Sequence, residues 1–252
     1  MKKLCALGGS FFDGGFWKKV LTMVRRYDIL TISHIMNDGH DMKSERRRKE
    51  HEARRKAILK AAREVFFRKG FMDATVDEIA ERCDLAKGTI YLYFGSKEEL
   101  YISIMAEGMK LLGKELERLK DIDGGDGRLV EHALTGYYGF YRKNRKYFRI
   151  MFLSSQPDLR ARVPDELLKN CMETARQCLG IVEGLVRKGI EKGIYRKVDP
   201  WAVANILWAT VNGIIMSYEQ DPVYREEIVG IELEKMLNEA LDLVLGGLRS
   251  KG

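Results

Sequence analysis

Residues 75–100 read TVDEIAERCDLAKGTIYLYFGSKEEL, and this stretch decides the fold. It begins and ends with the same signal, a hydroxyl residue followed three positions later by a glutamate: Thr75 with Glu78, and Ser96 with Glu99. In such a capping box the hydroxyl accepts the backbone N–H of the glutamate, whose side chain reaches back to the first residue. The sequence therefore predicts that one helix begins after Thr75 and another after Ser96.

Between the two boxes there is room for only two short helices. Residues 84–86 interrupt the first, and residues 87–94 allow barely two turns of the second, with Ile90 and Phe94 facing the core. Upstream, apolar residues recur at the spacing of one buried helical stripe, and Gly70 is expected to end that helix. The stripe consists of Ile58, Ala61, Ala62, Val65 and Phe66. Three short helices with a tight turn between the last two describe a helix-turn-helix.

The rest of the chain continues the helical pattern, and no strand pattern appears after residue 42. A glycine-rich break at residues 121–127 follows a long helix that ends near residue 120. Further helices are expected at residues 129–142, 147–153, 163–192, from Asp199-Pro200 to about Tyr218, and at 223–245, with a loop at 154–157. The predicted fold class is all-α, with an N-terminal helix-turn-helix domain and a C-terminal helical domain.

The net charge of +7 is concentrated in one place, because residues 42–60 contain nine Lys and Arg against three Glu. A local basic block indicates a polyanionic partner. A solvated helix face and an anionic membrane surface are the alternatives. No apolar run approaches the roughly 20 residues that span a bilayer, so we expect no integral membrane protein. The four cysteines show no CxxC spacing and no neighbouring His, which favours reduced cytoplasmic thiols over a disulfide scaffold or a zinc site.

Two segments resemble the DNA-binding signature of the TetR/AcrR family of bacterial and archaeal transcriptional regulators: TVDEIA at residues 75–80 and KGTIYLYFGSKEEL at residues 87–100. The resemblance covers about residues 52–112. One departure is Asp84, where the family usually has glycine, although Asp tolerates left-handed backbone better than most residues. The resemblance implies a DNA-binding domain followed by a variable domain that binds a ligand and dimerises.

The resemblance also implies which residues contact DNA. Small residues at the start of the second short helix let the backbone approach base edges, and Lys87 can reach a guanine or a phosphate. Three positions have an alternative role: Gly88 as a packing or capping glycine, Thr75 as a helix cap, and Tyr93 as a half-buried core residue. Lys97 opposes the dipole of its helix, which favours a phosphate partner. The expected contacts are Arg54, Arg55, Thr75, Ala86, Lys87, Gly88, Thr89, Tyr91, Leu92, Tyr93 and Lys97.

One such unit makes few base contacts, so two units related by a two-fold axis are expected to read half-sites roughly 34–36 Å apart. The last two helices are the expected dimer interface, with an internal core as the alternative. The resemblance further implies a cavity for an apolar or aromatic effector within residues 129–220, although such an aromatic set is usually ordinary core. The candidate pocket residues are Tyr137, Phe140, Tyr141, Phe148, Phe152, Met172, Trp201 and Trp208. His132 and Arg176 are weaker candidates for a ligand anchor.

The sequence thus predicts four parts. Residues 1–41 are a disordered extension, a small accessory arm or a segment before the true start at Met42, since glycine pairs oppose helix propagation there. Residues 42–96 form the helix-turn-helix domain, residues 97–120 a connecting helix, and residues 121–252 the ligand-binding and dimerisation domain.

The predicted function is that of a homodimeric, ligand-responsive regulator, a repressor that binds a palindromic operator in double-stranded DNA in the cytoplasm. We find no nucleophile–base pair, metal-ligand spacing or cofactor loop, so we expect no enzymatic activity, no cofactor and no metal. A small-molecule-binding helical protein without a DNA function, and a helical enzyme with an unrecognised site, are the alternatives.

Overall fold

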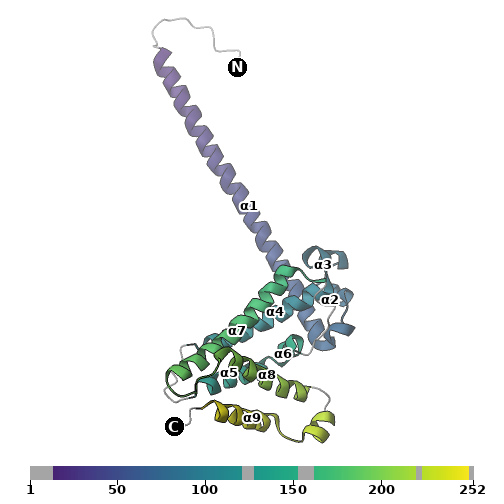
Figure 1. Ribbon diagram of the computed structural model, residues 1–252. Coiled ribbons are helices and arrows are strands. Elements are labelled where there is room, and N and C mark those ends of the chain that lie inside the picture. The colour runs from purple at the N-terminus through teal and green to yellow at the C-terminus, as the bar shows by residue number, and fades with distance from the viewer. Residues whose placement is uncertain (1–13, 121–127, 153–161, 220–222, 250–252) are drawn as a thin grey trace. The chain divides into compact units, whose positions relative to one another are not determined.

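A computed structural model describes residues 14–120, 128–152, 162–219 and 223–249, with the backbone alone for residues 14–43 (Figure 1). The described chain is all-α, as predicted, and its one strand-like pairing is an isolated bridge between Tyr195 and Arg249. None of the described helices is both long and apolar enough to cross a membrane. The predicted linker at 121–127 and loop at 154–157 lie outside the described residues.

The chain divides into two units, Met1–Lys56 and Ala57–Gly252, which we describe separately. In the first unit the backbone is helical from the start of α1 (Gly14–Asp73). A glycine pair at the start of a helix does not interrupt its propagation, so residues 14–41 are helical despite the predicted barrier. Their absence from the natural protein stays a prediction, and residues 1–13 are not described.

The second unit begins with a head, residues 57–104, made of three helices and the start of a fourth. It consists of the end of α1, α2 (Val76–Arg82), α3 (Lys87–Tyr93) and the first turns of α4 (Lys97–Glu117). The predicted stripe on α1 is buried, which confirms it as the core of the head. Gly70 adopts φ +75°, so the predicted break in α1 is also confirmed, and Phe71 then packs edge-on against Tyr101.

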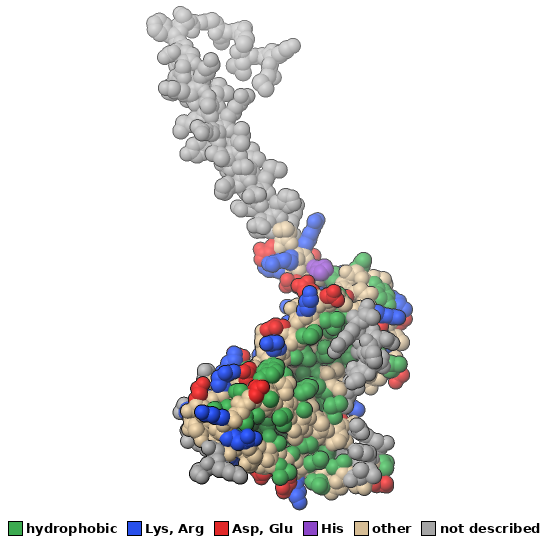
Figure 2. Space-filling view, viewed as in Figure 1, with side chains coloured by type: hydrophobic (Ala, Val, Ile, Leu, Met, Phe, Trp, Pro, Cys, Tyr) green, Lys and Arg blue, Asp and Glu red, His purple; other side chains and the backbone are tan. Residues whose placement is uncertain are grey.

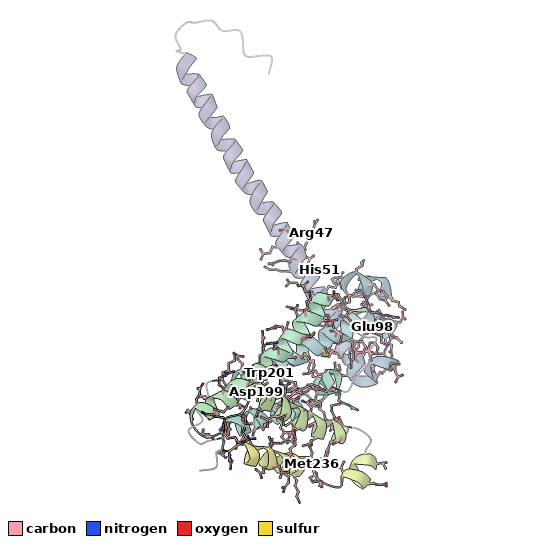
Figure 3. All side chains as sticks on the ribbon, viewed as in Figure 1. Arg47, His51, Glu98, Asp199, Trp201 and Met236 are labelled. Carbon is pink, nitrogen blue, oxygen red and sulfur yellow. The ribbon has the colours of Figure 1, made fainter. Side chains whose placement is uncertain are left out.

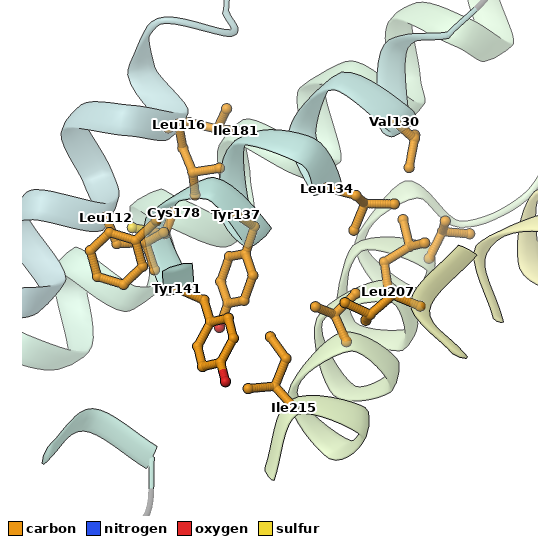
Figure 4. Close-up of a cluster of buried hydrophobic side chains, with 14 of the residues drawn as sticks. Leu112, Leu116, Val130, Leu134, Tyr137, Tyr141, Cys178, Ile181, Leu207 and Ile215 are labelled. Atoms are coloured by element: carbon orange, nitrogen blue, oxygen red, sulfur yellow. The ribbon is translucent and has the colours of Figure 1, made fainter. Parts of the chain in front are cut away.

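The body, residues 105–249, consists of the remaining helices. They are the rest of α4, α5 (Leu129–Lys143), α6 (Arg145–Phe152), α7 (Asp165–Glu191), α8 (Pro200–Glu219), the π-helix η2 (Tyr224–Val229) and α9 (Leu233–Leu248). α4 lies beside α7 and also packs against α5 and α6, while α8 packs between α7 and α9 (Figure 1). Figure 4 shows the core that joins them, with Leu112, Tyr137, Cys178 and Ile215 contributed by four different helices.

Local signals place most helix ends in the body correctly. The helix start predicted at Asp199-Pro200 is confirmed: Asp199, labelled in Figure 3, caps α8, because its Oδ1 accepts the backbone N–H of Trp201 at 2.9 Å. One expectation is wrong. The single last helix over 223–245 is divided into η2 and α9, since Gly230 adopts φ +59° and breaks it.

The turn between α2 and α3 depends on one residue in a left-handed conformation. Asp84 has φ +54°, and it is the one non-glycine residue with positive φ in the described part of the chain. Its backbone position lets the N–H of Leu85 reach the carbonyl oxygen of Ala80 at 2.9 Å, which closes the turn. This is the place where the sequence departs from the glycine of the TetR/AcrR signature.

Asp84→Gly is therefore expected to stabilise the chain by about 1 kcal/mol, because glycine adopts this backbone without a Cβ clash. A gain of this size raises the melting temperature by about 2–4 °C, measurable by circular dichroism. Asp242→Gly is the matched control, because Asp242 is exposed in the interior of α9 and glycine there should lower stability. Equal effects of the two changes would contradict the role of the turn.

Candidate functional site

Two side-chain caps fix where the helices around α3 begin. Thr75 Oγ1 accepts the backbone N–H of Glu78 at 3.2 Å, and Glu78 Oε2 accepts that of Thr75 at 3.3 Å. Ser96 Oγ accepts the backbone N–H of Glu99 at 3.0 Å. The Glu99 carboxylate accepts the backbone N–H of Gly95 at 2.8 Å, one residue before the Ser96 N–H that a capping box would use. Both predicted helix starts are confirmed, and α3 is held between them.

The two sides of α3 differ sharply in burial. Ile90 and Phe94 are buried in the core of the head, as predicted. Lys87 and Tyr91 are exposed on the other side, and Leu92 is 81% exposed. A seven-residue helix thus presents a basic, an aromatic and an apolar side chain outward, which suits contact with the edges of base pairs.

The start of α3 is open to close approach by another molecule. A Cβ atom added at Gly88 would meet nothing within 4 Å, so no packing within the described chain requires glycine there. Ala86, the N-cap of α3, supplies no side-chain hydrogen bond. An exposed helix start made of small residues lets a backbone come close, which supports the expected role of Gly88 over its alternative role in packing.

Two lysines at this surface are held by contacts within the chain. Lys87 Nζ lies 2.7 Å from Asp77 Oδ2, and this hydrogen bond raises the pKa of Lys87. Lys97 Nζ donates to the carbonyl oxygen of Met72 at 3.3 Å and lies 4.5 Å from the centre of the Phe71 ring. Partial burial removes water from Lys97 and lowers its pKa, so an anion beside it would replace the missing hydration.

Four predicted DNA contacts come together around one polar hollow of the head. Thr75, Lys87, Tyr91 and Lys97 all line it, and so does Arg162, which precedes α7. Sequence reasoning missed Arg162, because no local pattern brings a residue from the body beside α4. The other predicted contacts lie elsewhere: Thr89 and Tyr93 are half-buried, while Arg54 and Arg55 belong to the first unit.

A cavity of about 330 Å³ lies in the body. Five helices line it, from α4 to α8, and none of the lining residues is charged. Two of its polar groups are paired within the chain: the Tyr137 hydroxyl donates to Asn212 Oδ1 at 2.7 Å, and Asn205 Nδ2 donates to the carbonyl oxygen of Trp201 at 2.8 Å. Burial raises the pKa of the Cys178 thiol in the wall to about 11. The cavity therefore suits an apolar, uncharged group.

The structure places three of the eight candidate pocket residues at this cavity: Tyr137, Phe152 and Trp208. Phe140, Tyr141 and Phe148 are buried in the surrounding core, Met172 is exposed, and Trp201 lies under the surface residue Arg176 with the guanidinium 5.7 Å from its ring. Sequence reasoning missed the contribution of α4, which supplies Met109, Leu112 and Leu116.

The comparisons with known proteins bear on both sites. The family profile described as "Bacterial regulatory proteins, tetR family" matches residues 58–104, which include the caps, the turn and all of α3. The helix-turn-helix-type transcriptional regulator YfiR of Bacillus subtilis (strain 168) is 31% identical over 192 residues, which cover 71% of this chain and 85% of YfiR. The chain belongs to the TetR family. It is therefore a DNA-binding transcriptional regulator, of a family without enzymatic activity.

Two solved structures share the fold of this TetR-family chain. FadR from Bacillus subtilis, in complex with stearoyl-CoA, has a TM-score of 0.56 and 24% identity, over 76% of this chain and 97% of FadR. SmeT, the repressor of the Stenotrophomonas maltophilia multidrug efflux pump SmeDEF, has a TM-score of 0.58 and 24% identity, over 79% of this chain and 91% of SmeT.

The helix α6 contacts both the cavity and the head of this TetR-family regulator. Met151 and Phe152 line the cavity, while Ile150 is buried in the core of the head. Gly108 on α4 makes this packing possible, because a Cβ there would come within 2.8 Å of Met151 Sδ and 3.1 Å of Tyr147 Cδ1.

Tyr147 forms the other end of this contact. Its hydroxyl accepts from Arg63 Nη1 at 3.0 Å and donates to Glu107 Oε2 at 3.2 Å, and its ring meets Phe67 edge-on at 5.0 Å. A displacement of α6 would thus reach α1 through a hydrogen bond and a ring contact.

Ala175→Phe is expected to abolish binding of the neutral apolar dye N-phenyl-1-naphthylamine, because the ring would occupy the space beside Cys178. The measurement is dye fluorescence during titration of the full chain. Met172→Phe is the control, since Met172 is exposed on the same helix outside the cavity. Equal dye binding by Ala175→Phe and the wild-type chain would show that the dye does not enter this cavity.

Proposed function

We propose that this TetR-family regulator is a homodimeric repressor that binds a palindromic operator and releases it when a small apolar or aromatic effector occupies the cavity. The observation that carries the proposal is that α6 belongs both to the cavity wall and to the packing of the head. An effector that prefers one position of α6 would favour one placement of the head, and operator affinity would change with it.

The chemistry of the cavity supports the class of effector. Its wall is mainly apolar and contains no charged residue, and the Tyr137 hydroxyl is hydrogen-bonded to Asn212. The FadR structure of similar fold was solved with stearoyl-CoA, whose acyl chain is apolar, and SmeT of similar fold is a repressor. A ligand-binding helical protein without a DNA function would share the cavity, but it would not need the exposed side of α3.

The exposed surface of the last two helices supports a dimer. On α8, Ile206 is 53% exposed and stands in one stripe with Ala202, Ala209 and Gly213, all exposed. On α9, Leu243 is 78% exposed. Figure 2 shows hydrophobic side chains gathered over the α7, α8 and α9 part of the molecule. Small residues let helices approach closely, so these faces suit a four-helix contact across a two-fold axis.

Tyr91→Ala and Lys97→Ala are each expected to weaken operator binding roughly tenfold. Tyr91→Ala removes a contact with a base or with the DNA backbone, and Lys97→Ala removes a contact with a phosphate. Lys97→Ala should also lower the slope of log K against log salt by about one unit per head, and Tyr91→Ala should leave it unchanged. The probe is a duplex that the wild-type chain enriches from a random-sequence pool, and the readout is gel shift at several salt concentrations.

The control for these variants is Lys169→Ala, an exposed lysine on α7. Circular dichroism checks that every variant is folded. Wild-type affinity in both head variants would contradict the placement of the DNA-binding surface. Failure of the wild-type chain to enrich any duplex would refute the proposed operator binding.

Ile206→Glu and Leu243→Glu are expected to shift the protein from dimer to monomer, because each places a charge in the centre of the proposed interface. Light scattering after size-exclusion chromatography gives the mass. Met172→Glu, also at an exposed apolar position but on α7, should remain dimeric. A wild-type chain that is already monomeric would refute the dimer.

A further inference from the structure

Arg162 stands at the junction of the body and the head. It lies three residues before α7, yet its backbone is attached to the N-cap of α4, because Ser96 Oγ donates to the Arg162 carbonyl oxygen at 2.9 Å. The same Ser96 hydroxyl accepts the N–H of Glu99 and so caps α4. One serine therefore defines the start of α4 and also holds Arg162 beside it.

The Arg162 side chain has little to hold it within the protein. It is 72% exposed, and its ion pair with Glu98 is a long one, from Nη1 to Oε1 at 3.5 Å. Glu98, labelled in Figure 3, belongs to the first turn of α4 at the edge of the head. The Glu98 side chain is only 16% exposed, but with the guanidinium in solvent and 3.5 Å between the charged atoms the pair contributes little to stability. The stability of the fold therefore does not explain an arginine at this position.

The surroundings of Arg162 do suggest a partner. The hollow that it lines is also lined by Thr75, Tyr91 and Lys97, three residues that the proposed function places against DNA. Thr75 and Lys97 are expected to contact backbone phosphates rather than bases. A guanidinium carries five N–H donors in a planar fork that matches two phosphate oxygens. An arginine beside Lys97 therefore suits a phosphate of the same DNA strand better than a second lysine would.

We propose that Arg162 binds a DNA backbone phosphate beside the one expected at Lys97, so that the DNA-binding surface includes a residue of the ligand-binding body. This inference rests on the proposed function. The contact with Glu98 is exchanged for one with phosphate when DNA binds. Because Arg162 belongs to the body and not to the three helices of the head, the head alone would lack this contact.

Arg162→Ala is expected to weaken binding to the enriched operator duplex about tenfold and to lower the log-salt slope by about one unit per head. Arg162→Lys should keep the slope, because the charge remains, and bind with intermediate affinity. Arg187→Ala is the matched control. Arg187 is an exposed arginine on α7 paired with Glu183, so its removal changes the net charge equally and should leave both quantities unchanged.

Glu98→Gln separates a DNA contact from a structural role. If Arg162 served only to hold Glu98, removal of either partner would weaken operator binding alike. The proposal instead predicts wild-type or tighter binding for Glu98→Gln, because a competing carboxylate is removed. The inference is overturned if Arg162→Ala keeps the wild-type affinity and slope, or if Glu98→Gln weakens binding as Arg162→Ala does. Wild-type failure to select any duplex would refute the proposed function itself.

Discussion

Burial of Ile90 and Phe94 is the constraint on which the proposed DNA-binding surface depends. A helix of seven residues is too short to be stable in water, so α3 exists only because this side of it packs into the head. The same packing determines which residues remain outside. Lys87, Gly88 and Tyr91 are exposed because Ile90 and Phe94 are buried. Any rotation of α3 that exposed Phe94 would bury part of the proposed DNA-binding surface.

The features that the sequence predicted are those set by neighbouring residues. The caps at Thr75, Ser96 and Asp199 involve atoms two to four residues apart, and Asp84 supplies its own left-handed turn. The family signature added the fold of the head. Glycine was a correct signal at one position and a missed one at another. Gly70 breaks α1 as expected, whereas Gly230 breaks a helix that apolar spacing had predicted to continue.

The cavity was harder to predict for a physical reason. An aromatic residue in a helical stripe has the same spacing whether it fills the core, as Phe148 does, or faces a cavity, as Phe152 does. Which of the two occurs depends on how helices distant in sequence approach one another. Gly108 is an example: its lack of a side chain brings α6 onto α4, and no pattern within α4 reveals the partner. The hydrogen bond between Ser96 and Arg162 joins residues 66 positions apart, so no local sequence pattern could predict it.

Charge arrangement rather than total charge decides how the head meets DNA. Residues 57–104, the head, contain seven Lys and Arg and eight Asp and Glu, so the head has no net positive charge to attract a polyanion. The cations at the hollow stand beside acids: Lys87 of the head beside Asp77, and Arg162 of the body beside Glu98. The exposed Lys87–Asp77 pair costs little to break, about 0–1 kcal/mol, and the Arg162–Glu98 pair is long, at 3.5 Å. A DNA phosphate placed beside one of these cations can replace its carboxylate partner. A duplex whose phosphates do not reach the cations is instead repelled by the carboxylates. Such ion pairs lower the affinity for DNA of any sequence, but they preserve the affinity for a duplex whose phosphates lie beside the cations.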